Sequence, residues 1–247
     1  MSGAPMQHIG ILSHSFEGAT LCYHEACTEG VRRLGPHRHP EITLTGVAMD
    51  HMLDAWTRGD LAELRGMFIT DAEKLAAAGA DFFICPDNSA HIALEAPGAP
   101  FPIPGLNIAE VVADQALSDG RRKIGILGTE WTMGGPVYRG ALGRRGLDFA
   151  IPDEAQRKDV HAIIMDELCL GVFSEQSRAR YVAIIETLAA DGCDAVALVC
   201  TEIPLLVKPQ DSPLPTLDST RLLARAAVAV AIGERPMPDW RGGPVGG

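Results

Sequence analysis

Short apolar runs alternate with longer amphipathic stretches along this chain of 247 residues. In the first half the apolar runs predict strands, and the stretches between them carry apolar residues at helical spacing. The predicted strands are residues 8–12, 41–47, 82–85 and 102–106, and the predicted helices are about residues 19–34, 60–78 and 109–117. Gly79 directly follows the helix of residues 60–78, in the position that commonly ends a helix. The polar loop Ser13-His14-Ser15 follows the first strand.

The second half has the same order of elements. Its predicted strands are residues 123–127, about 147–151, 195–199 and 214–217, and its predicted helices are residues 160–170, 175–190 and 219–232. Strands that alternate with helices indicate an α/β fold with parallel sheets covered by helices. The tail of residues 234–247 is rich in proline and glycine, and we expect it to be frayed.

The chain contains an internal repeat. Ile9-Gly10-Ile11-Leu12 recurs as Ile124-Gly125-Ile126-Leu127, an offset of 115 residues. Blocks around Glu73, Gly79 and Pro100 recur at an offset of 113 residues. A nearly constant offset over separate blocks predicts two similar domains related by a pseudo-two-fold axis, which would present two loops to opposite sides of one ligand.

Composition narrows the class of protein. A hydrophobic content of 47% with 5% aromatic residues is ordinary for an α/β protein, and the formal net charge of -11 argues against binding to nucleic acid. No charged leader with an apolar core and no run of about 20 apolar residues is found, so we expect a cytoplasmic protein that does not bind membranes. The six cysteines lack CxxC spacing and are expected to be free thiols. The histidines lack metal-site spacing, so no metal is expected.

Cys200 is the first candidate for chemistry. It lies at the end of a predicted buried strand, in the sequence Val199-Cys200-Thr201-Glu202-Ile203-Pro204. Backbone N–H groups at the start of a following helix would lower the pKa of the thiol and favour thiolate. The alternative is a core cysteine that closes the strand. Thr201 and Glu202 favour the first interpretation, because polar residues are poor core material.

The repeat aligns Asp87 with Cys200. Asp87 lies eight residues after Gly79, as Cys200 does after Gly192. The same register aligns Cys85 with a residue inside a strand, which favours a core position for that thiol. Asp87 is therefore a candidate base, although an aspartate at this point also suits the cap of a following helix. His91 either orients or protonates a neighbour or only satisfies local hydrogen bonds.

Ligands of open parallel sheets bind beyond the carboxyl ends of the strands. Four loops lie there, at residues 13–20, 86–91, 128–133 and 200–204. We expect the substrate to be bound by their polar residues, namely Ser13, Asn88, Ser89, Thr129, Thr132 and Thr201. The hydroxyls of Thr129 and Thr132, with the free N–H groups of the next helix, suit a carboxylate, although a helix N-cap explains Thr132 equally well.

Several motifs resemble those of the aspartate/glutamate racemase family, especially its broad-specificity amino-acid racemases. The resemblance covers nearly the whole chain and is carried by Leu127-Gly128-Thr129 with Thr132-Met133, Tyr138-Arg139-Gly140, Ile151-Pro152-Asp153-Glu154, Glu167-Leu168-Cys169-Leu170-Gly171 and Cys200-Thr201-Glu202-Ile203-Pro204-Leu205-Leu206. The usual first motif of the family is Cys-Asn-Thr-Ala-His, and the equivalent here is Asp87-Asn88-Ser89-Ala90-His91. Aspartate thus stands in place of the first catalytic cysteine.

The resemblance implies two α/β domains, an active site in the cleft between them, chemistry without a cofactor, and a homodimer. It further implies a C-terminal helix that packs on the first domain. The domains would be residues 1–106 with about 218–247, and residues 107–217.

Together these observations predict a cofactor-independent amino-acid racemase. Two bases must flank the α-carbon, and we assign Cys200 to one face and Asp87 to the other, with His91 and Glu202 tuning their protonation. One alternative is a one-thiol decarboxylase or isomerase acting on a small carboxylate. Another is a ligand-binding sensor without chemistry.

Overall fold

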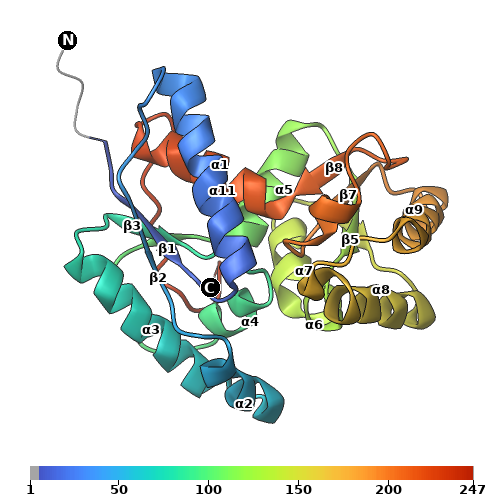
Figure 1. Cartoon of the computed structure of the whole chain (residues 1–247), viewed down its shortest axis with the longest axis horizontal. Coiled ribbons are helices and arrows are strands. Elements are labelled where there is room, and N and C mark those ends of the chain that lie inside the picture. Colours follow the sequence, from blue (N-terminus) through green and yellow to red (C-terminus); the bar gives the residue numbers. More distant parts are fainter. Residues whose placement is uncertain (1–5, 247) are drawn as a thin grey trace. The chain divides into compact units, whose positions relative to one another are not determined.

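The computed structural model describes residues 6–246 of the chain. The chain divides into two compact units. The first unit extends to Ile108 and resumes at Leu223, and the second unit comprises residues Ala109 to Leu222. Each unit contains one parallel four-stranded sheet with helices packed beside it (Figure 1). The predicted α/β class with parallel sheets is confirmed.

The first unit has its strands in the order β2-β1-β3-β4. Its elements are β1 (Ile9–Leu12), α1 (Phe16–Leu34), β2 (Ile42–Thr45), α2 (Asp50–Arg58), α3 (Leu61–Ala77), β3 (Phe82–Ile84), α4 (Ala90–Leu94), β4 (Gly105–Leu106) and most of α11 (Ser219–Ala231). The sheet lies between α3 and α1 (Figure 1), and α3 contacts β1, β2 and β3.

The second unit has the strand order β6-β5-β7-β8, which is the topology of the first unit repeated. Its elements are α5 (Ile108–Ser118), β5 (Lys123–Leu127), α6 (Glu130–Gly134), α7 (Pro136–Gly143), β6 (Asp148–Ala150), α8 (Glu154–Asp166), the 3-10 helix η1 (Leu168–Leu170), α9 (Glu175–Ala190), β7 (Ala195–Leu198), α10 (Ile203–Leu206) and β8 (Thr216–Asp218). In both units the first and third strands in sequence are neighbours at the centre of the sheet.

The repeated glycines within the strands allow close helix packing. A Cβ atom at Gly10 would lie 3.0 Å from Leu75 of α3, and one at Gly125 would lie 2.9 Å from Leu188 of α9. Leu75 and Leu188 are themselves equivalent in the repeat. The shared sequence therefore encodes the same contact between a central strand and a helix in each unit.

The repeated Gly-x-Asp segments join each helix to its sheet. Gly79 and Gly192 have φ angles of 90° and 87°, a backbone conformation that glycine adopts without strain. Two residues later, the Asp81 carboxylate accepts the backbone N–H of His8 at 2.7 Å, and Asp194 accepts that of Arg122 at 2.9 Å. These repeated residues hold the strands in place, and we assign them no catalytic role.

Two helices begin earlier than predicted. α1 begins at Phe16 instead of about residue 19, because the Ser15 side chain caps it by accepting the N–H of Gly18. α8 begins at Glu154 instead of residue 160, because Asp153 and Gln156 form a capping box.

The hydrophobic pattern missed α2 and several short helices. α2 has no side-chain cap at Met49 and carries mostly polar residues, so its sequence lacks a start signal. It ends at Gly59, which has a φ angle of 67°. The pattern also missed the short helices α4, α6, α7 and α10, none longer than 8 residues. The loop residues nevertheless led us to expect a helix start after Asp87, in the loop of residues 128–133 and after Cys200, where α4, α6 and α10 lie.

The C-terminal tail is ordered along its described part, so the expectation of a frayed tail was wrong. The backbone N–H groups of Phe101 and Gly105 donate to the carbonyls of Arg241 and Trp240 at 2.9 and 2.8 Å. The Trp240 ring packs on Phe83 with a centroid distance of 6.0 Å. Backbone pairing with a distant loop outweighs the low local propensity of this segment.

Within residues 6–246, no helix is long and apolar enough to cross a membrane. The same residues contain no cluster of three or more histidine, cysteine or acidic side chains able to hold a metal ion. The cysteines are all free thiols.

Candidate active site

The candidate residues lie at the carboxyl ends of the two central strands of each sheet. Ser13 follows β1, and Asp87 lies three residues after β3. Thr129 lies two residues after β5, and Cys200 lies two residues after β7. Each unit thus presents two candidate loops at one sheet edge.

The Asp87 carboxylate is held by two donors. Its Oδ1 accepts the backbone N–H of Ala90 at 3.0 Å, and its Oδ2 lies 2.8 Å from Nδ1 of His14. The side chain keeps 17% of its surface exposed. Burial alone would raise the pKa of Asp87, but the His14 ring lowers it below its usual value. Asp87 therefore caps the turn before α4 and also presents an ionised carboxylate.

His14 and Trp56 were not among the predicted site residues. His14 is buried after β1, and its Nε2 accepts the indole N–H of Trp56 at 2.8 Å. Trp56 lies on α2, the helix that the hydrophobic pattern missed. A polar triplet after a buried strand was the available signal for His14, but no local signal pointed to Trp56.

His91 is buried and bonded through both ring nitrogens. Its Nδ1 lies 2.9 Å from the backbone carbonyl of Asp87, and its Nε2 accepts the backbone N–H of Ile108 at 3.2 Å. Trp240 stacks on the ring at a centroid distance of 6.0 Å. Burial lowers the pKa of His91 to about 4. The ring is therefore neutral near pH 7, and it contacts the main chain of Asp87 instead of the carboxylate.

The other predicted residues of the first unit lie close to this loop. Asn88 is buried and Ser89 is partly buried. The Ser13 hydroxyl donates to the backbone carbonyl of Ser15 at 3.3 Å. Cys85 is fully buried, and burial raises its pKa well above the usual value. That environment agrees with a core thiol at Cys85.

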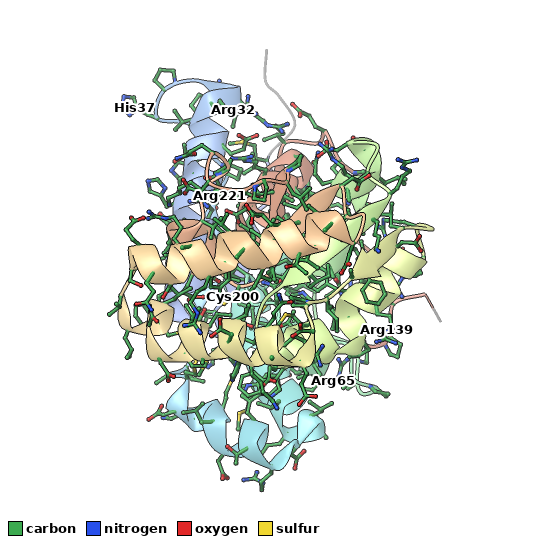
Figure 2. The ribbon with its side chains drawn as sticks, turned by 90° about the vertical axis from the view of Figure 1, so that its right-hand side faces the viewer. Arg32, His37, Arg65, Arg139, Cys200 and Arg221 are labelled. Atoms are coloured by element: carbon green, nitrogen blue, oxygen red, sulfur yellow. The ribbon has the colours of Figure 1, made fainter. Side chains whose placement is uncertain are left out.

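Cys200 is partly exposed, and its thiol donates to the carboxylate of Glu202 at 2.9 Å. Burial of the sulfur and the adjacent Glu202 charge raise the pKa of Cys200 well above its usual value. The expected lowering of this pKa by a helix start was therefore wrong. The helix that follows, α10, has only four residues, and a carboxylate beside the sulfur opposes thiolate formation. Figure 2 shows Cys200 between α8 and α9 in that view.

Thr129 and Thr132 form a hydroxyl pair after β5. Thr129 is the N-cap of α6, and its hydroxyl accepts the N–H of Thr132 at 3.2 Å. The two hydroxyl oxygens lie 3.0 Å apart, and both residues are buried. The helix cap anticipated at Thr132 is thus made by Thr129. Thr201, beside Cys200, is also buried.

Two arginines that could neutralise a second substrate carboxylate are engaged elsewhere. Arg58 pairs with Asp54 and Glu63 at exposed positions of the first unit. Arg139 is exposed and stacks over Phe149 with 5.6 Å between the guanidinium carbon and the ring centroid. Figure 2 shows Arg139 at the edge of the second unit, away from Cys200.

Two α/β units of one topology, each with a parallel four-stranded sheet flanked by helices, define a racemase-type fold. The chain belongs to the Asp/Glu/Hydantoin racemase family, which it matches over residues 9–227. Racemases are isomerases, and the predicted family and enzyme class are confirmed.

Individual relatives agree with this assignment. The chain is 25% identical to the broad-specificity amino-acid racemase RacX of Bacillus subtilis (strain 168) over 173 residues, 69% of this chain and 73% of that protein. It is 32% identical to a Yersinia pestis protein classed with the Asp/Glu racemases, with a TM-score of 0.83 over 92% of this chain and 100% of that chain. The aspartate racemase homologue PH1733 of Pyrococcus horikoshii OT3 is 25% identical, with a TM-score of 0.75 over 92% of this chain and 99% of that chain.

Proposed function

We propose that this protein is a cofactor-independent amino-acid racemase in which Asp87 and Cys200 act on opposite faces of the α-carbon. The observation that carries the proposal is the difference in proton state between the two groups. Asp87 accepts hydrogen bonds from His14 and Ala90 and is a carboxylate. Cys200 donates to Glu202 and is a thiol. One base and one acid are what a single racemisation step requires.

The proton balance of this step is complete. Asp87 takes the α-proton, and the electron pair of the broken C–H bond moves into the substrate carboxylate as an enediolate. The Cys200 thiol then delivers its proton to the opposite face of the α-carbon. The products are the other enantiomer, a protonated Asp87 and a Cys200 thiolate, which is the state that processes the reverse reaction.

Hydroxyl and amide groups at the strand ends would bind the substrate carboxylate. We assign this task to Ser13, Asn88, Ser89, Thr129, Thr132 and Thr201. Hydrogen bonds to the carboxylate strengthen as negative charge develops on it, which lowers the barrier to α-proton removal. Glu202 raises the pKa of Cys200 and so keeps it protonated until it donates. His91 positions the backbone of the Asp87 loop.

The charge at these loops favours a substrate whose side chain is neutral or cationic. The ionisable groups beside the two candidate catalytic residues include Glu202, an acid, while Arg58 and Arg139 are engaged with other partners. A second carboxylate on the substrate would be repelled by Asp87 and Glu202.

Chiral chromatography over a panel of amino acids tests the function. We expect interconversion of neutral or basic amino acids and little turnover of aspartate or glutamate. Deuterium uptake at the α-carbon should accompany racemisation in D₂O. Absence of racemisation and exchange across the panel would refute the proposal.

A one-thiol decarboxylase or isomerase is the second candidate. It is favoured by one observation, namely that Cys85, the other cysteine near a candidate loop, is fully buried, which leaves Cys200 as the accessible thiol of the pair. Carbon dioxide release from substituted malonates, or isomerisation of maleate, without amino-acid racemisation would support this alternative.

A further inference from the structure

Three side chains from separate segments form a hydrogen-bonded chain that ends on Asp87. The indole N–H of Trp56 donates to Nε2 of His14 at 2.8 Å, and Nδ1 of His14 lies 2.8 Å from Oδ2 of Asp87. The His14 ring meets Trp56 edge-on and Phe68 at an angle, with centroid distances of 5.8 and 5.7 Å. The imidazole is thus fixed by packing as well as by hydrogen bonds.

The donors in this chain can be arranged in only one way. An indole nitrogen donates and never accepts, so Nε2 of His14 must carry a lone pair. A neutral imidazole then has its proton on Nδ1, and that N–H donates to Asp87. Asp87 must accept this bond, which requires the carboxylate oxygen to be unprotonated.

We propose that Trp56 and His14 are positioning residues that hold Asp87 as an ionised, oriented base, with Trp56 fixing His14 in its Nδ1–H tautomer. This inference rests on the proposed function for its catalytic meaning. Neither ring nitrogen of His14 is available to a substrate, since one donates to Asp87 and the other accepts from Trp56. His14 therefore acts through Asp87 and does not itself exchange a proton with the α-carbon.

The groups around His14 explain why a fixed tautomer matters. Burial lowers the pKa of His14, and the Asp87 carboxylate raises it above its usual value. The helices α2 and α3 present uncharged rings, Trp56 and Phe68, to the imidazole. A second proton would have to bind Nε2, where the Trp56 N–H already points. Trp56 thus opposes formation of an imidazolium, whose full charge would make Asp87 a weaker base.

Nitrogen-15 NMR of the ligand-free chain tests the tautomer directly. We expect the His14 signals, assigned from their loss in His14→Gln, to show a protonated Nδ1 and an unprotonated Nε2 near neutral pH. A protonated Nε2, in either an imidazolium or the other tautomer, would overturn the inference. This measurement requires no activity and no folded Trp56 variant.

Trp56→Phe then tests the contribution of the indole N–H. Its removal should raise the pKa of His14 by on the order of one pH unit, since one hydrogen bond to the neutral ring is lost. The acid limb of kcat/KM should move to higher pH by a similar amount. Trp131→Phe is the matched control, because Trp131 also meets a histidine edge-on, namely His161, and should leave the His14 titration unchanged.

The outcomes separate this inference from the proposed function. An unchanged His14 pKa in Trp56→Phe would mean that Trp56 only fills space, and the inference would fail even if racemisation were found. If the tautomer and the pKa shift are as stated and no amino acid is racemised, the proposed function fails and the positioning of Asp87 stands.

Discussion

The loops after β3 and β7 occupy equivalent places in two units of one topology, yet they hold their central residues in opposite proton states. After β3, Asp87 receives hydrogen bonds from His14 and the backbone of Ala90. After β7, Cys200 gives a hydrogen bond to Glu202. The two loops thus share a backbone topology, but the central residue accepts hydrogen bonds in one loop and donates one in the other.

This difference teaches that the partner residue, more than the backbone, sets the chemistry of each loop. The His14 ring keeps the pKa of Asp87 low, whereas an adjacent carboxylate keeps the pKa of Cys200 high. If both loops carried the same partner, both groups would tend to be ionised or both protonated. In the proposed mechanism, the acid and the base would follow from partners of opposite kind.

The largest expected effect comes from removing the acid. Cys200→Ser should lower racemisation by at least about 10³-fold and abolish deuterium uptake from both enantiomers, because a hydroxyl is a far weaker acid than a thiol and does not release its proton near neutral pH. Chiral chromatography and proton NMR in D₂O measure the two effects. Cys27→Ser, at a partly exposed thiol of α1, is the control and should retain activity. Exchange that persists in Cys200→Ser would show that the assignment is wrong.

Removing the base should cost about 10²-fold to 10⁴-fold in kcat/KM. Asp87→Asn preserves the shape of the side chain and its capping oxygen but cannot accept the α-proton. Asp87→Cys should be more active than Asp87→Asn, since it restores an ionisable group. The control is Asp60→Asn, because Asp60 also caps a helix, α3, through the N–H of Glu63. Equal losses in Asp87→Asn and Asp60→Asn would mean that Asp87 only caps.

A smaller effect is expected when the partner of the thiol loses its charge. Glu202→Gln removes the carboxylate charge that, besides burial, raises the pKa of Cys200, so this pKa should fall by on the order of one unit. The midpoint of iodoacetamide alkylation against pH should move to lower pH. Glu154→Gln, at an exposed glutamate paired with Lys158, should leave the midpoint in place. A midpoint that is unchanged or higher in Glu202→Gln would contradict the proposed influence of Glu202.

The smallest expected effect is on stability, and it concerns the tail that packs against the Asp87 loop in the first unit. In the first unit Trp240 of the tail stacks on His91 and packs on Phe83. Trp240→Ala should lower the free energy of unfolding by about 1–3 kcal/mol, as expected for loss of a half-buried aromatic ring. Urea denaturation gives the value. Trp131→Ala, at a residue that is 54% exposed, should change it much less, and equal losses would refute the supporting contact.

The sequence predicted the scaffold well because the repeat reflects local geometry. Gly79 and Gly192 adopt positive φ angles, and Gly10 and Gly125 admit a leucine from the packed helix. Such requirements act within a few residues or between neighbouring elements. They constrain the sequence at both copies, so they can be recognised before the fold is known.

The surroundings of the candidate site were harder to predict. His14 and Trp56 are 42 residues apart, and their hydrogen bond depends on α2, which has no capping side chain. The tail pairs with Phe101, which is separated from it by most of the chain. Periodicity and composition describe one segment at a time and do not include such pairings.

The pKa of Cys200 was predicted to be lowered by a following helix, but it is raised. A short helix does follow the thiol. The Glu202 carboxylate has a larger influence on this pKa than the helix does. Glu202 lies two residues after Cys200, so the sequence already contained the residue that raises the pKa. The side chain that bonds to the sulfur outweighs the local backbone geometry.

The division of the first unit between both ends of the chain has a consequence for biosynthesis. Residues up to Ile108 are synthesised before the second unit, but this unit also includes residues from Leu223 onward, which are synthesised after it. The second unit is one continuous segment and can finish folding earlier. Until the tail arrives, the N–H of Gly105 in the edge strand β4 lacks the Trp240 carbonyl that it binds. The edge strand β4 therefore depends on a segment that is synthesised only after the whole second unit.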